Sequence, residues 1–158
     1  MQKITPFLWF DQNAEEAVDF YCSIFKGAKK GAVTHYPDGA PMPKGTVMTV
    51  SFKLEGQDFT ALNGGPEFKF NNSVSLTVFC ETQEEIDLYW DKLTADGGKP
   101  NVCGWLQDKY GLSWQINPAI LPQLISDKNP ARAARVLQAV WRMGKLDIKQ
   151  LKEAANAA

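Results

Sequence analysis

The sequence predicts an α+β fold made of two βαβββ modules and a helical tail. Strand and helix patterns follow one another in the order β-α-β-β-β over residues 1–66, and a second β-α-strand series occupies residues 72–118. After Pro118 the composition changes and helical apolar stripes replace the alternating patterns. We therefore expect one domain, divided at 1–66, 72–118 and 119–158.

The composition supports a single compact domain and excludes several classes of function. The chain has 158 residues, of which 44% are hydrophobic and 22% charged, close to the usual length of one domain. Seventeen basic residues against 18 acidic ones leave no basic excess for nucleic acid. No apolar run is long enough to span a membrane, and residues 1–10 lack the features of a signal peptide, so we expect a cytoplasmic protein.

Histidine and cysteine are scarce, which restricts metal and thiol chemistry. His35 is the single histidine, so any site that needs two imidazoles from one chain is excluded. Cys22, Cys80 and Cys103 are odd in number and widely spaced, which predicts reduced, mostly buried thiols in place of disulfides or a zinc site.

The first module begins with a strand over residues 4–10 and continues with an amphipathic helix. Asn13 and Glu16 have the spacing of a helix N-cap and its N3 partner, and Gly27 is expected to end the helix. Apolar residues recur on one face of this helix, at Ala14, Ala17, Val18, Tyr21, Ile24 and Phe25.

Three further strands are predicted over residues 32–36, 46–54 and 58–63. Residues 37–45 are rich in proline and glycine and predict a loop. The strand over 46–54 alternates clearly, with one face formed by Met48, Val50, Phe52 and Leu54. Gly64, Gly65 and Pro66 end the module.

The second module repeats this order. A strand over residues 73–80 precedes Thr82 and Glu85, which again have capping-box spacing, and the helix that follows carries Ile86, Tyr89, Trp90 and Leu93 on one face. Strands are predicted over residues 99–107 and 112–117. Residues 18–21 and 86–89 have similar sequences, a weak repeat that agrees with the shared order of elements.

The tail is expected to be helical. Asn129 followed by Pro130 predicts an N-cap with proline at the first helical position, and Asp147 can cap a last helix. The first tail helix carries an apolar stripe of Ala133, Val136, Leu137, Val140 and Trp141. Packing on the same subunit and packing across a dimer explain this stripe equally well.

Several segments together resemble one known family. These are residues 4–10, 13–17, 20–21, 44–45, 61–66, 103–105 and 111–115. They are similar to the PhnB-like group of the vicinal-oxygen-chelate superfamily, also called the glyoxalase/bleomycin resistance superfamily, whose members are often named 3-demethylubiquinone-9 3-methyltransferase-like. The resemblance covers essentially the whole chain, including the tail. It implies paired βαβββ modules, each curved around a concave pocket, and usually a homodimer.

The resemblance also implies where a divalent metal would be held, because the superfamily takes His, Glu or Gln ligands from the first and last strands of each module. The corresponding positions here fall near Thr5 or Pro6, and at Asn63, Ser73 and Gln115. Only Gln115 is a ligand type that the superfamily uses, and neutral Ser and Asn are weak ligands for a transition metal. We expect no cofactor and regard a metal site as disfavoured.

Six residues are candidates for lining a small-molecule pocket. The aromatic ones on predicted strands are Trp9, Phe52, Trp105 and Trp114; each alone is explained by core packing, but together they suggest an aromatic-lined cavity. Asn63 and Gln115 lie among apolar neighbours, where an amide either satisfies the backbone or contacts a ligand.

Three functional hypotheses follow. The first is a small-molecule binding protein, or an enzyme that works without a metal, with an aromatic-lined pocket. The second is a metal-dependent lyase, isomerase or dioxygenase that keeps Gln115 as a ligand, and the third is a non-catalytic dimeric interaction module. A methyltransferase is not supported, because Gly64-Gly65 is followed by proline and no helix pattern opens there.

Overall fold

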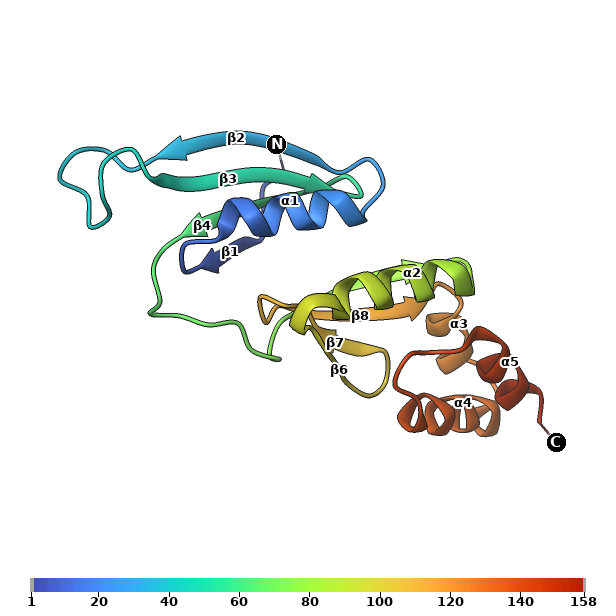
Figure 1. Cartoon of the computed structure of the whole chain (residues 1–158). Helices are drawn as coiled ribbons and strands as arrows, with labels where there is room; N and C mark the ends of the chain where they lie inside the picture. The colour runs from blue at the N-terminus through green and yellow to red at the C-terminus, as the bar shows by residue number, and fades with distance from the viewer. Residues whose placement is uncertain (1, 158) are drawn as a thin grey trace. The chain divides into compact units, whose positions relative to one another are not determined.

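The computed structural model describes residues 2–157, which form two compact units divided between Phe70 and Asn71. The first unit contains one βαβββ module, and the second contains the other module together with the tail (Figure 1). Within residues 2–157, no helix has the length and apolar character needed to cross a membrane.

The first unit is a four-stranded sheet with one helix against it. Its elements are β1 (Phe7–Phe10), α1 (Ala14–Ile24), β2 (Lys29–His35), β3 (Val47–Leu54) and β4 (Gln57–Asn63). The strand order is β1-β4-β3-β2, with β1 parallel to β4 and the other pairs antiparallel. The expected order of elements is confirmed, although β1 begins three residues later than predicted and β2 begins three residues earlier.

The core of this unit lies between the sheet and α1. On the predicted apolar face of β3, Val50, Phe52 and Leu54 are buried and Met48 is half-buried. The ring of Phe52 stacks on Tyr21 of α1 at 6.2 Å and on Phe59 of β4 at 5.1 Å between centroids. The side chains of Thr49, Ser51 and Lys53 therefore emerge on the opposite face of the sheet.

The start of α1 differs from the expectation. Asn13 occupies the N-cap position, but its side chain makes no capping hydrogen bond. The Ala14 amide instead donates to Oδ1 of Asn63, 2.8 Å away, at the end of β4. The predicted capping box at Asn13 and Glu16 is therefore wrong, because a buried amide from a distant strand occupies the place that the local side chain would take.

The second unit repeats the same sheet and adds the tail. Its elements are β5 (Ser75–Cys80), α2 (Gln83–Thr94), the short 3-10 helix η1 (Ala95–Gly97), β6 (Lys99–Pro100), β7 (Trp105–Gln107), β8 (Ser113–Pro118), α3 (Leu121–Ile125), α4 (Pro130–Arg142) and α5 (Ile148–Asn156). The strand order β5-β8-β7-β6 matches that of the first sheet, which confirms the paired-module fold.

The strand predicted over residues 99–107 is broken in two. Cys103 and Gly104 both adopt left-handed backbone conformations, with φ of 61° and 79°. Such a pair cannot continue a β-ladder, so the chain leaves the sheet after β6 and returns at β7. We call residues 101–104 the β6–β7 connection.

The tail builds a small core of its own on the second unit. Val136 and Val140 of α4 pack with residues of α3, α5 and the linker between the helices, namely Leu121, Leu146, Leu151 and Ala155. The predicted caps are confirmed, since Asn129 accepts from the Ala131 amide and Asp147 from the Gln150 amide. Trp141 lies outside this core and is 63% exposed, so the stripe predicted for α4 is only partly covered in one chain.

Candidate functional site

The second sheet has one face covered by α2 and one face turned away from it. Along β8 the side chains alternate, and the buried Trp114 and Ile116 belong to the covered side, so Gln115 projects from the other. We call this other side the open face and define it by the six residues that share it around Gln115 on three strands: Ser75, Thr77, Trp105, Gln107, Ser113 and Gln115. Phe79 and Asn117, the next pair along β5 and β8, continue the same face.

Gln115 lies at the centre of the open face. Its Cα pairs with that of Thr77 on β5 and with that of Trp105 on β7, so a hydroxyl, an amide and an indole form one row across the sheet. Nε2 of Gln115 donates to Oγ of Ser75 at 2.9 Å. This bond fixes the amide plane and directs its carbonyl oxygen, Oε1, elsewhere on the face.

A second group of polar side chains borders this row. Oδ1 of Asn72 accepts from Oγ of Ser113 at 2.9 Å and from Nε2 of Gln107 at 2.8 Å. These groups are all neutral. Ser113 is fully buried, so the open face offers the amides of Gln107 and Gln115 and the hydroxyls of Ser75 and Thr77 beside an aromatic ring. Lys99, at the β6 edge, pairs with Gln107 and adds a charged residue in register with this face.

A cavity of about 300 Å³ adjoins this face. It is lined by Asn72, the β6–β7 connection and Trp105, with Asn101, Val102 and Cys103 contributed by the connection. Trp105 belongs both to the row around Gln115 and to the cavity wall, so the cavity and the open face are parts of one site.

Two of the predicted site residues lie in cores. Trp114 is buried on the α2 side of its sheet, and its indole Nε1 donates to Oδ2 of Asp108 at 2.8 Å. Phe52 is buried inside the first unit between Tyr21 and Phe59. The structure does not place either ring on an open face.

Trp9 and Asn63 belong to the first unit and have different surroundings. Trp9 is half-buried, its Nε1 donates to the Gly65 carbonyl at 2.9 Å, and Phe68 meets its ring edge-on at 5.0 Å. Asn63 is 8% exposed, and both atoms of its amide are used: Oδ1 accepts from the Ala14 amide, and Nδ2 donates to the Val47 carbonyl at 3.1 Å. Asn63 therefore supports α1 and β3.

The positions implied for metal ligands do not suit a transition metal. Ser73 donates from Oγ to Asn71, both amide atoms of Asn63 are engaged with the backbone, and Nε2 of Gln115 donates to Ser75. Thr5 and Pro6 precede β1 and add at most one hydroxyl. Neutral amides and hydroxyls are poor ligands for such ions, so these residues do not fit the metal that the superfamily uses.

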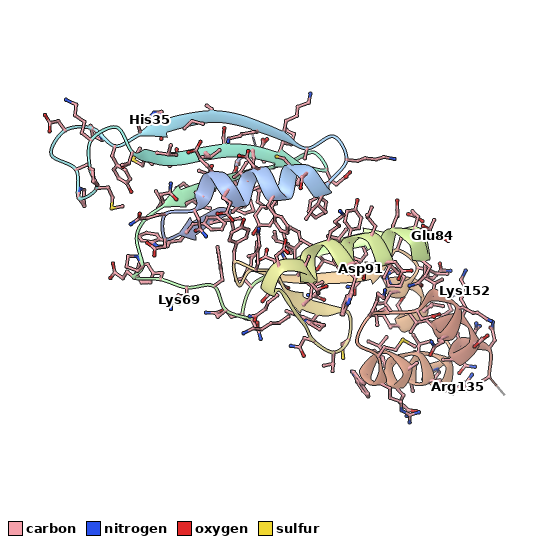
Figure 2. The ribbon with its side chains drawn as sticks, viewed as in Figure 1. His35, Lys69, Glu84, Asp91, Arg135 and Lys152 are labelled. Carbon is pink, nitrogen blue, oxygen red and sulfur yellow. The ribbon has the colours of Figure 1, made fainter. Side chains whose placement is uncertain are left out.

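His35 does not supply the missing metal ligand. It ends β2, at the opposite edge of the first sheet from β1, beside the long loop to β3 (Figure 2). Among residues 2–157, His, Cys, Asp and Glu side chains nowhere gather in a group of three or more that could hold a metal ion.

All three cysteines are free, but Cys80 alone is buried; Cys22 and Cys103 are half-buried, so the expectation of mostly buried thiols is wrong. Burial raises the pKa of Cys80 to about 12, and burial also raises the pKa of Cys22, with Asp19 contributing. Neither thiol is therefore activated as a nucleophile. Cys103, in the cavity wall, donates its backbone amide to the Met143 carbonyl at 2.7 Å.

Sequence reasoning did not find Asn72, Ser75 or Thr77. Thr77 and Ser75 alternate with apolar residues along β5, which was a usable signal for one face of that strand. Their pairing with Gln115 depends on the register of the parallel strands β5 and β8, which lie about 40 residues apart in the sequence. Local sequence patterns do not predict that register.

Comparisons with known proteins identify the family of this chain. A model of the 3-demethylubiquinone-9 3-methyltransferase family matches residues 2–117, so the tail lies outside the matched part, contrary to the expectation that the resemblance includes it. The PhnB protein of Bacillus cereus is 40% identical, with a TM-score of 0.68, over 75% of this chain and 100% of that one. No curated protein matches the sequence.

More distant structures share the fold alone. A protein of Pseudomonas aeruginosa is 20% identical over 75% of this chain and 98% of its own, with a TM-score of 0.61. The fosfomycin resistance protein FosX of Listeria monocytogenes, solved with Mn(II) and sulfate, is 18% identical over 75% of this chain and 93% of its own, with a TM-score of 0.50. The chain therefore belongs to the 3-demethylubiquinone-9 3-methyltransferase family, the PhnB-like family.

Proposed function

We propose that this protein binds a small organic molecule on the open face of the second sheet, without a metal ion held by its own side chains. The observation that carries the proposal is the row Thr77, Gln115 and Trp105, in which a fixed amide lies beside an indole ring. Ligand sites commonly combine apolar or aromatic walls with a few oriented polar groups of this kind.

The chemistry of the open face suggests the class of ligand. Oε1 of Gln115 can accept a hydrogen bond, the hydroxyl of Thr77 can donate or accept one, and the Trp105 ring offers an apolar surface for stacking. A neutral molecule with a ring and with hydroxyl or carbonyl groups fits these partners. Lys99 is the charged residue that the strand register places beside these six neutral ones, so a multiply charged ligand would lack a matching set of counter-charges.

The six residues of the open face favour ligand binding over catalysis. General acid–base catalysis needs a group that gains or loses a proton near the working pH, and none of the six side chains of the open face titrates in that range. Metal-independent catalysis would therefore need a reactive group from outside these six residues.

Methyl transfer, which the family name denotes, is not part of this proposal. The common S-adenosylmethionine fold requires a glycine-rich turn that leads from a first parallel strand into a helix. Here Gly64 and Gly65 follow β4, and no helix begins between them and β5.

A homodimer is proposed as the working form. Phe7 on β1 and Phe79 on β5 are 60% and 57% exposed, and both strands lie at sheet edges. Exposed aromatic side chains on unpaired edges favour association with another chain. Sedimentation equilibrium tests this: a concentration-independent monomer would contradict it.

A metabolite thermal-shift screen, run with and without EDTA, tests the ligand site. A ligand that binds the folded protein raises its melting temperature. We expect a neutral ring-bearing compound to do so with and without EDTA, and expect Gln115→Ala and Trp105→Ala to remove the shift. Gln138→Ala, an exposed glutamine on α4, is the matched control and should keep it. A shift that EDTA abolishes would favour the metal-dependent alternative.

A further inference from the structure

The tail reaches the cavity wall through two backbone hydrogen bonds. The amides of Cys103 and Gly104 donate to the carbonyls of Met143 and Gly144, at 2.7 and 2.8 Å. Both donors belong to the left-handed turn of the β6–β7 connection, which carries three of the five residues that line the cavity. The chain between α4 and α5 runs beside this connection (Figure 1).

Side chains reinforce the same contact. Cys103 packs against the tail core, and a Cβ added at Gly104 would lie 3.1 Å from Cδ1 of the fully buried Leu146. The Gly104 carbonyl accepts from the Ile116 amide of β8 at 2.8 Å. The connection is thus held between the sheet on one side and the tail on the other.

The tail segment is in turn fixed to α2. Nε2 of Gln83 donates to the Leu146 carbonyl at 3.1 Å, and Oε1 of Gln83 accepts from the Ile148 amide at 2.9 Å. Nζ of Lys145 lies 2.8 Å from Oδ1 of Asp87. A second, longer ion pair joins Nζ of Lys145 to Oδ1 of Asp91 at 3.7 Å. Gln83 and the two ion pairs of Lys145 therefore tie residues 145–148 to α2.

We propose that the tail segment Met143–Leu146 is a positioning element for the ligand site. It holds the β6–β7 connection in the left-handed conformation that forms the cavity beside Trp105, so a ligand bound to the open face depends on contacts made by the tail. The inference rests on the proposed function, because it assigns the tail a role in that same site. The segment lies outside the part of the chain that matches the family model.

The test uses the full chain and loosens the tail in two independent ways, with Gln83→Met and Lys145→Met. Hydrogen exchange of the peptide containing Cys103 and Gly104 reports how firmly the tail holds the connection. The affinity for N-phenyl-1-naphthylamine, an uncharged fluorescent probe with aromatic rings, reports the cavity. Ile86→Val, a core change in α2, is the control for a general loss of stability.

The expected results separate positioning from general destabilisation. Loss of these contacts should speed exchange of the peptide about tenfold and weaken probe binding in both tail variants, while Ile86→Val leaves both unchanged. Unchanged exchange and probe affinity in the tail variants, or equal effects in all three variants, would overturn the inference. If Trp105→Ala leaves probe binding to the otherwise native protein unchanged, the proposed ligand site fails and the positioning role fails with it.

Discussion

Nε2 of Gln115 donates a hydrogen bond to Oγ of Ser75, 2.9 Å away, across the parallel strands β8 and β5. Gln115 is the one residue at the implied metal positions that the superfamily uses as a ligand. Its partner here is a neutral hydroxyl, which holds the amide as a hydrogen-bonding group.

Replacement of Ser75 tests the importance of this bond. Ser75→Ala removes the acceptor for Nε2 of Gln115, so we expect a loss of about 0.5–1.5 kcal/mol in the free energy of unfolding and weaker binding of any compound found by thermal shift. Urea denaturation and the ligand-induced shift measure the two effects. Ser23→Ala, at an exposed serine on α1 of the first unit, is the control and should leave the ligand-induced shift unchanged.

Asn63 should contribute more to stability than the residue at the N-cap position itself. Asn63→Ala leaves the Ala14 amide and the Val47 carbonyl without their partners, so a loss of about 1–3 kcal/mol is expected in urea denaturation. Asn13→Ala is the matched control, and because the Asn13 side chain caps nothing, it should cost less than about 0.5 kcal/mol. The reverse ranking would contradict the assignment of the cap.

Gly64 allows the close approach of Trp9. A Cβ at Gly64 would come within 2.4 Å of the indole ring, so Gly64→Ala must displace Trp9 and should cost about 1–3 kcal/mol of stability. Gly144→Ala is a suitable comparison, since its Cβ would meet its nearest neighbour, the Asn101 carbonyl, at an ordinary 3.5 Å. Melting temperatures and the indole signal of Trp9 in NMR spectra measure the difference, and equal melting temperatures would argue against this packing.

The ion pair that ties the tail to α2 should make stability depend on pH in acid. Hydrogen bonds from Lys145 and Gln83 lower the pKa of Asp87 below its ordinary value of 3.8. A carboxylate with a lowered pKa in the folded state stabilises the protein above the unfolded-state pKa, and this contribution is lost as the pH falls through the folded-state pKa. Asp87→Asn should therefore be less stable than the natural protein at neutral pH, and the two should converge in acid. Urea denaturation at a series of pH values measures this, and a constant difference would contradict it.

The order of the elements could be predicted because it depends on local patterns. Alternation over β3 and the apolar stripes of α1 and α2 specify which face of each element is buried, independently of partners far away in the sequence. The caps at Thr82, Asn129 and Asp147 were equally predictable, since each side chain bonds an amide two or three residues away.

The features that escaped prediction depend on contacts between distant residues. The Ala14 amide at the start of α1 bonds to Asn63, which is 49 residues away in the sequence, and not to Asn13. The residues around Asn13 give no indication of this distant partner. The β6–β7 connection turns at Cys103, a non-glycine residue in a left-handed conformation whose amide is paired with Met143 of the tail. Gly104, the next residue, was a sequence signal for a turn. The strand-like residues on either side of it led to the prediction of one continuous strand.

In the candidate site, too, local patterns predict some features, and contacts between distant residues determine the others. Gln115 and Trp105 could be chosen from strand patterns, but their alignment in one row with Thr77 follows from strand register. Aromatic identity could not separate Trp105, which borders the cavity, from Trp114, which is buried one position before Gln115 on the other face.

The metal content of the purified protein tests the central claim most directly. Elemental analysis after purification without chelators, repeated after incubation with Mn(II), Ni(II), Zn(II) or Fe(II), should give substoichiometric metal for the natural protein and for Gln115→Ala alike, while the thermal shift from a bound compound persists in EDTA. Stoichiometric metal in the natural protein that is lost in Gln115→Ala would contradict the account and make Gln115 a metal ligand.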